Sequence, residues 1–337
     1  MSVASGTRKR KRVAEDTPGQ TKQAGQSALP HADLWYEDGN IILATDATLF
    51  KVHRSIISRQ SGVLKTITLL SEQATQSVEG CPIARLPEDS DDVAQMLYGI
   101  YDNRIFMQNK PVSFTAVSAW FWMGTKYDID YLRDEALSRI LACYPDTLDC
   151  YDQIEESWSS RPPIVWTPSQ DYDVALLAQA HSLLNILPVA LYECCAGRPE
   201  ELTIRLSFDA LHTTDPSLPS FDPKILQRLF VGRAELVRQR MSESLCFLDG
   251  ERSPRCRQSS CRLVSGYMVS LSHKAGVFTD NARTLDDQND LIDVTCGAQS
   301  NLQACADCVN FFKKRHQDGR QKVWDNLRTI FRIPEEL

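Results

Sequence analysis

The chain has 337 residues, of which 42% are hydrophobic and 24% are charged, and its net charge is −7. This composition is ordinary for a globular protein of roughly two domains, and it excludes a fibrous or wholly disordered chain. The charge is unevenly placed: residues 1–30 hold six Lys or Arg and two acidic residues, a local charge of +4 that leaves −11 on residues 31–337. The acidic body argues against direct nucleic-acid binding, which needs a basic surface.

Residues 1–30 are poor in large apolar side chains, and we expect them to form a disordered basic tail. The tail contains an unbroken run of five positive charges: Arg8, Lys9, Arg10, Lys11 and Arg12. Such a run is typical of a nuclear import signal, whose receptor pairs extended basic side chains with acidic pockets. The alternative is a solvated tail or an arm that binds phosphates without specificity.

The N-terminus is charged where a secretory leader would be apolar, and the sequence has no apolar run of about 18 residues that could cross a bilayer. We therefore expect a soluble intracellular protein without membrane partners, located in the nucleus, the cytoplasm or both. In that setting its eleven cysteines should be mostly reduced.

The stretch from Asp33 to Arg54 predicts two short strands that lead into a helix. The apolar run 41–43 is followed by a turn at residues 46–47 and by a second apolar segment, 49–52, in which Lys51 is expected to point outward. This alternation is typical of a hairpin with one buried face, and the helix should start near His53.

Two amphipathic helices are predicted between residues 114 and 141, because apolar residues recur there at spacings of three and four. The residues of the two faces are Phe114, Val117, Trp120, Phe121 and Gly124, then Leu132, Ala136, Leu137, Ile140 and Leu141. Such a helical pair must cover an apolar surface, and the hairpin region is the neighbour of matching size. An α+β domain of about 115 residues follows.

The order of several motifs connects residues 31–145 to a known family. The motifs are Asp38-Gly39, Phe50-Lys51-Val52-His53-Arg54, Ser61-Gly62-Val63-Leu64, Pro82 to Pro87, a helix ending at Tyr101, and Lys126-Tyr127-Asp128-Ile129 with Leu132. In this order and spacing they resemble a BTB/POZ domain, which implies a small sheet capped by helices. The resemblance makes His53 a structural residue at the junction of strand and helix.

The resemblance also implies function through surfaces. BTB domains typically homodimerise by burying apolar faces of their first helices and by exchanging an N-terminal strand. The residues that would carry this dimer face are Leu34, Trp35, Tyr36, Val52, Ile56 and Ile57. We therefore expect a non-enzymatic protein–protein interaction module that forms a homodimer and acts as an adaptor or scaffold.

Two more specific roles remain open. Many BTB proteins are substrate adaptors of a cullin-3 ubiquitin ligase and bind it through a hydrophobic-x-Glu motif, which Leu70-Ser71-Glu72 would supply. Glu72 is equally consistent with an exposed charge at a helix end. The alternative role is a nuclear transcriptional co-regulator that binds corepressor-like proteins through the BTB face.

Beyond residue 145 the chain is predicted to be mainly helical. Residues 146–170, which hold prolines together with Trp158 and Trp166, are interpreted as a linker, and residues 171–337 as a helical C-terminal domain. The expected helices are 174–187, 189–195, 225–247, 286–316 and 319–331. The segments 186–195, 232–236 and 324–327, with the late cysteine pairs, resemble the C-terminal half of BTB proteins of mushroom-forming fungi.

Four late cysteines allow two interpretations. Cys256, Cys261, Cys305 and Cys308 form two pairs whose spacing could present four thiolates to a structural zinc ion, with Cys246, His273 and Cys296 as further candidates. Alternatively they are small buried hydrophobes, like Cys194 and Cys195. The second interpretation is favoured, because the first pair is widely spaced and 43 residues separate the pairs. No metal or cofactor is therefore expected.

Signatures of enzymes are missing from the sequence: it has no Gly-x-Ser-x-Gly elbow, no phosphate-binding loop, no dinucleotide-binding turn and no His-Glu-x-x-His helix. The acidic run from Glu88 to Asp92 is interpreted as the start of a helix, where negative charge is favoured, in preference to a metal site. We expect no catalytic residues.

Overall fold

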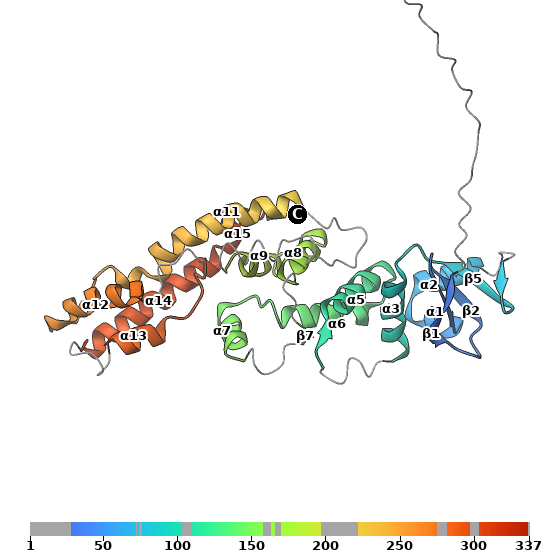
Figure 1. The fold of residues 1–337 in the computed structure, drawn as a ribbon, viewed down its shortest axis with the longest axis horizontal. Coiled ribbons are helices and arrows are strands. Elements are labelled where there is room, and N and C mark those ends of the chain that lie inside the picture. The colour runs from blue at the N-terminus through green and yellow to red at the C-terminus, as the bar shows by residue number, and fades with distance from the viewer. Residues whose placement is uncertain are drawn as a thin grey trace, which may run out of the picture.

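The computed structural model describes residues 28–71, 73, 76–102, 110–157, 163–165, 170–196, 222–274, 282–296 and 303–335. The molecule is elongated, with a sheet and its helices at one end and a helical region at the other (Figure 1). The first strand begins at Leu29, so the last residues of the expected tail belong to the folded part. The run from Arg8 to Arg12 lies outside the described residues.

Five strands form one mixed sheet in the order β1-β3-β2-β5-β4. The predicted hairpin is present as β2 (Ile41–Ala44) and β3 (Thr48–Val52), which run antiparallel. The strand β1 (Leu29–Trp35) lies parallel to β3 at one edge. On the other side, β5 (Cys81–Arg85) lies parallel to β2 and pairs with the short β4 (Ser77–Val78).

Lys51 departs from the expected pattern, because it is buried instead of pointing outward. Its Nζ lies 2.9 Å from Oε2 of Glu79 and 5.9 Å from the centre of the Trp35 ring. A lysine can bury its aliphatic stem while its ammonium group keeps a charged partner. The ring that contributes to this burial comes from β1, a neighbour that the local alternation of the hairpin does not reveal.

The helices of this end follow in the predicted order. They are α1 (Arg54–Gln60), α2 (Gly62–Ser71), α3 (Ser90–Tyr101), α5 (Phe114–Lys126) and α6 (Asp130–Leu141). The acidic run does start a helix: Asp89 caps α3 by accepting a hydrogen bond from the Asp91 N–H. Gly124 permits the close packing of α5 on α6, because a Cβ there would lie 2.7 Å from the backbone nitrogen of Arg133.

The segment expected to be a linker contains ordered structure. It forms α7 (Leu148–Ser157), whose Leu148 and Tyr151 are buried, and β7 (Ile164–Val165), which pairs with β6 (Val112–Ser113). Trp158 and Trp166 lie outside the described residues. The next helices are α8 (Gln170–Ala180) and α9 (Leu187–Ala196), with Pro188 in the first turn of α9 as expected.

The remaining helices differ in number and bounds from the prediction. The expected helix 225–247 is α11 (Pro223–Gln239), followed by a π-helical turn η3 (Arg240–Ser244) and a 3₁₀ turn η4 (Cys246–Leu248). A helix that was not expected, α12 (Ser260–Lys274), comes next. In place of the expected helices 286–316 and 319–331, the chain forms α13 (Asn289–Cys296), α14 (Ala306–Asp325) and α15 (Leu327–Ile330), and α14 continues through the break that was expected after residue 316.

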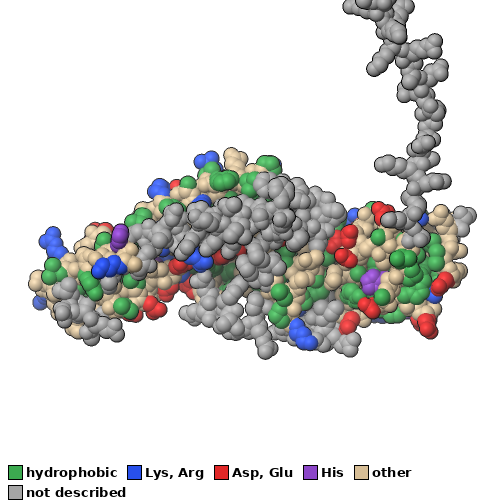
Figure 2. All heavy atoms as spheres, in the orientation of Figure 1, with side chains coloured by type: hydrophobic (Ala, Val, Ile, Leu, Met, Phe, Trp, Pro, Cys, Tyr) green, Lys and Arg blue, Asp and Glu red, His purple; other side chains and the backbone are tan. Residues whose placement is uncertain are grey.

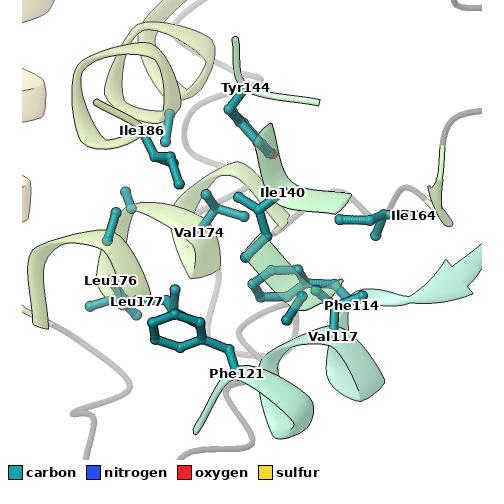
Figure 3. Packing of buried hydrophobic residues seen from close by; sticks show 14 of the residues in the cluster. Phe114, Val117, Phe121, Ile140, Tyr144, Ile164, Val174, Leu176, Leu177 and Ile186 are labelled. Carbon is teal, nitrogen blue, oxygen red and sulfur yellow. The ribbon is translucent and has the colours of Figure 1, made fainter. Parts of the chain in front are cut away.

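One hydrophobic core runs through most of the molecule, from Leu34 to Ile333. Figure 3 shows its middle, where Phe121 of α5 and Ile140 of α6 lie near Val174 and Leu177 of α8. The expected domain boundary at residue 145 therefore does not separate two independent cores. A second, smaller core lies at the far helical end and consists of Leu245, Phe247, Cys261, Val264, Met268, Ile292, Cys296, Cys308 and Phe312.

Arg320 adds a polar link between segments that are far apart in the sequence. Its guanidinium is buried, its Nη1 lies 3.1 Å from the Asp152 carboxylate on α7, and its Nε donates a 2.7 Å hydrogen bond to the Leu285 carbonyl. The helix α14 is thereby tied to α7 by charge as well as by packing.

Candidate functional site

The junction of β3 and α1 orients the first helix of the sheet unit. The backbone N–H of His53 donates a 2.8 Å hydrogen bond to the Tyr101 hydroxyl, and its ring Nε2 lies 3.0 Å from the Asp38 carboxylate. The Tyr36 ring stacks on Tyr101 at a centre-to-centre distance of 4.7 Å. Burial raises the pKa of Tyr101 to about 12, so it stays a neutral hydrogen-bonding phenol. These contacts agree with the structural role expected of His53.

The six residues expected at a dimer face separate into two groups. Leu34, Val52 and Ile57 are buried in the chain's own core, so their side chains have no surface to offer a second molecule. Trp35, Tyr36 and Ile56 are half-buried and retain exposed area. The expected face is thus corrected to these last three, because the inner sides of β1, β3 and α1 are already covered by the chain itself.

An exposed apolar stripe on α2 lies next to this region. Val63, Ile67 and Leu70 are spaced by four and three residues and therefore share one face of the helix. Val63 and Leu70 are exposed, whereas Ile67 is half-buried and packs against the main core. The neighbouring face, with Leu64, is buried, but Leu70 is 64% exposed. Figure 2 shows hydrophobic side chains gathered at the end of the molecule where α1, α2 and β1 lie in Figure 1.

Sequence reasoning singled out only Leu70 of this stripe. A signal was available, because the apolar residues of α2 occupy more of its circumference than one buried face requires. Leu70 belongs to the expected cullin-binding motif and is exposed as that motif needs, whereas Ser71 is buried. Glu72 lies outside the described residues.

A hollow of about 710 Å³ lies between α11 and the C-terminal α15. Phe230, which is 67% exposed, and Ile330 supply apolar surface, while Glu235, Arg238 and Arg332 supply charge. The hollow is open to solvent and mixed in character.

The four cysteines considered for metal binding come together at the far helical end. Their Sγ atoms all lie within 4.8 Å of one another. The three further candidates are elsewhere: the Cys246 thiol contacts the Arg315 carbonyl, the Cys296 thiol contacts Met268, and His273 is exposed in the last turn of α12. In the described part of the chain, Cys256, Cys261, Cys305 and Cys308 form the group of side chains that could hold a metal ion.

Comparisons with protein-family models, with curated proteins and with solved structures each found no match. In the part of the chain that the structure describes, no helix combines the length and the apolar character needed to span a membrane.

Proposed function

We propose that this chain is a non-enzymatic protein-interaction module of the BTB/POZ type, which forms a homodimer and acts as an adaptor or scaffold inside the cell. The order of the sequence motifs supports the family, and the sheet with its helices is compatible with it. The observation that carries the proposal is the apolar stripe of α2, in which Val63 and Leu70 are exposed. Apolar surface of this kind on a folded chain marks a contact site.

The proposed partner of the stripe is the same stripe on a second copy. In a two-fold dimer the same surface of both subunits forms the interface. The apolar stripe of one copy can therefore be buried against the stripe of the other copy. Fully burying a leucine side chain contributes about 2 kcal/mol. Because Leu70 is 64% exposed and occurs twice in the dimer, burying both copies contributes about 2.6 kcal/mol, which is about 80-fold in the dissociation constant.

The experiment is light scattering and sedimentation equilibrium of the full chain. Wild-type protein should be a dimer, and Leu70→Glu should weaken dimerisation by about 80-fold or more, because two carboxylates would also have to be desolvated. The matched control is Val294→Glu on α13, a residue that is 57% exposed but far from α2 in Figure 1. It should leave the dissociation constant unchanged.

Two results contradict the proposal. One is a wild-type chain that stays monomeric at the highest concentration reached. The other is a dimer that Leu70→Glu and Val294→Glu weaken equally. Circular dichroism of both variants shows whether folding is intact.

The cullin-3 adaptor is a second candidate, favoured by the exposure of Leu70 at the C-terminal end of α2. In this role the helical region would hold the substrate, with the hollow beside Phe230 as its contact site. Pull-down with full-length Glu72→Lys and wild-type chains tests the idea. Recovery of cullin-3 by wild type alone supports it, and recovery by neither removes it in favour of the scaffold or co-regulator role.

A further inference from the structure

We infer that Cys256, Cys261, Cys305 and Cys308 form a structural zinc site. In a tetrahedral site with Zn–S bonds of about 2.3 Å, neighbouring sulfur atoms are about 3.8 Å apart. The Sγ atoms of Cys256 and Cys305 are separated by 3.8 Å, and all four lie within 4.8 Å of one another. The thiols are thus nearly placed for coordination, and all four are free.

Two helix N-termini and a tight turn bring the thiols together. Cys261 is in the first turn of α12, Cys305 immediately precedes α14, and Cys308 is in the first turn of α14. Cys256 closes a turn in which its N–H donates a 2.9 Å hydrogen bond to the Ser253 carbonyl. The N-terminal end of a helix favours negative charge, so this arrangement stabilises the thiolates that a metal requires.

The local charges and hydrogen bonds also suit a thiolate cluster. Four arginines flank the first pair of cysteines in the sequence: Arg252, Arg255, Arg257 and Arg262. A zinc ion with four thiolates carries two negative charges, and the positive charge of this segment would partly offset them. The backbone N–H of Cys305 donates to the Cys261 sulfur at 3.3 Å.

Core packing explains the cluster less well. Cys194 and Cys195 behave as buried hydrophobes, since both lie inside the main core. Cys256 and Cys305 are only half-buried at the edge of the second core, and their sulfur atoms are 3.8 Å apart. The second core is also small, and the segment between η4 and α12 adds no fully buried apolar side chain to it. A metal would supply the cross-link that such a core lacks.

The expected role of the metal is structural. Four protein ligands complete a tetrahedron, so no position remains for water or substrate. The ion would join the loop that carries Cys256 to the N-termini of α12 and α14, which are distant in sequence. It would thus fix the far end of the helical region and would not give the protein a catalytic activity.

The test is the metal content of the purified full chain, measured by inductively coupled plasma mass spectrometry. Wild-type protein should contain one zinc ion per chain, and Cys305→Ser and Cys308→Ser should contain almost none. The control is Cys296→Ser, which alters a cysteine of the same small core outside the cluster and should retain the metal. Replacement of zinc by Co²⁺ should give the visible spectrum of tetrahedral cobalt with thiolate ligands.

Three outcomes overturn the inference. Wild-type chain that binds neither zinc nor added Co²⁺ while its thiols react freely with Ellman's reagent has no site. A Cys256–Cys305 disulfide in protein isolated under thiol-blocking conditions assigns the pair to redox chemistry instead. If Cys296→Ser and Cys305→Ser lose zinc equally while circular dichroism shows both variants folded, the four named cysteines are not the specific zinc ligands.

Discussion

The contact between α14 and η3 depends on the absence of a side chain at Gly319. A Cβ at this position would lie 2.2 Å from the carbonyl oxygen of Glu243 and 2.7 Å from its carbonyl carbon. Both are backbone atoms, so the clash is relieved only by separating the two elements. That separation would stretch the 2.8 Å contact between His316 Nδ1 and the Ser244 carbonyl.

We therefore expect Gly319→Ala to destabilise the chain. Overpacking of this kind costs about 1–3 kcal/mol, and weakening a hydrogen bond adds about 1 kcal/mol. The alanine itself stabilises the helix by roughly 1 kcal/mol. The net loss is about 2 kcal/mol, which lowers the midpoint of thermal unfolding by about 3 °C in a chain of this size.

The assay is urea and thermal unfolding followed by circular dichroism, with Gly266→Ala as the matched control. Gly266 is also in the interior of a helix, α12, but no described atom lies within 4 Å of a Cβ built there. This substitution should stabilise by about 0.5–1 kcal/mol. If both variants are stabilised equally, α14 does not approach η3 as closely as described, and the reasoning is refuted.

Three further expectations follow from other residues. Arg320→Met should lower the free energy of unfolding in urea by about 2–4 kcal/mol, because it leaves the half-exposed Asp152 without its buried partner. Adding Asp152→Asn should recover part of this loss. If the effects of the two substitutions are strictly additive, the pair is not coupled. A hydrogen bond from the Arg315 guanidinium lowers the pKa of Asp249. The pair therefore stabilises the fold above about pH 4, and this contribution is lost as the pH falls through the lowered pKa. Consequently the destabilisation by Asp249→Asn should shrink in acid, and an effect that is constant with pH would contradict the ion pair. A fluorescent protein fused to residues 1–30 should accumulate in nuclei and should lose this accumulation when the run Arg8–Arg12 is changed to alanine; uniform distribution of both fusions would favour the solvated tail.

Elements with a strong local period could be predicted from the sequence. The hairpin of β2 and β3 and the helices α5 and α6 were expected near their observed bounds, because each pattern of buried residues lies within one short stretch. The buried state of Lys51 could not be read in this way, since it depends on Trp35 of β1 and on Glu79. Helix α12 was missed because the few apolar residues of its buried face are interrupted by serine and glycine.

The candidate sites depended still more on contacts between distant segments. The two cysteine pairs could be noted, but their convergence follows from the packing of α12 on α13 and of α13 on α14, which no local spacing encodes. In the same way, the burial of Leu34 and Ile57 follows from the closing of the chain on itself. Residue types therefore indicated the candidates, and tertiary structure selected among them.

The continuous main core, part of which is drawn in Figure 3, has a mechanical consequence. Because apolar side chains of α5, α6 and α8 interlock where a hinge would otherwise lie, the helical region extends from the sheet unit as a stiff arm. In the proposed two-fold dimer, two such arms would hold their tips at a set spacing and angle. Cutting the chain near residue 145 would expose this interlocked surface and leave both fragments prone to aggregate.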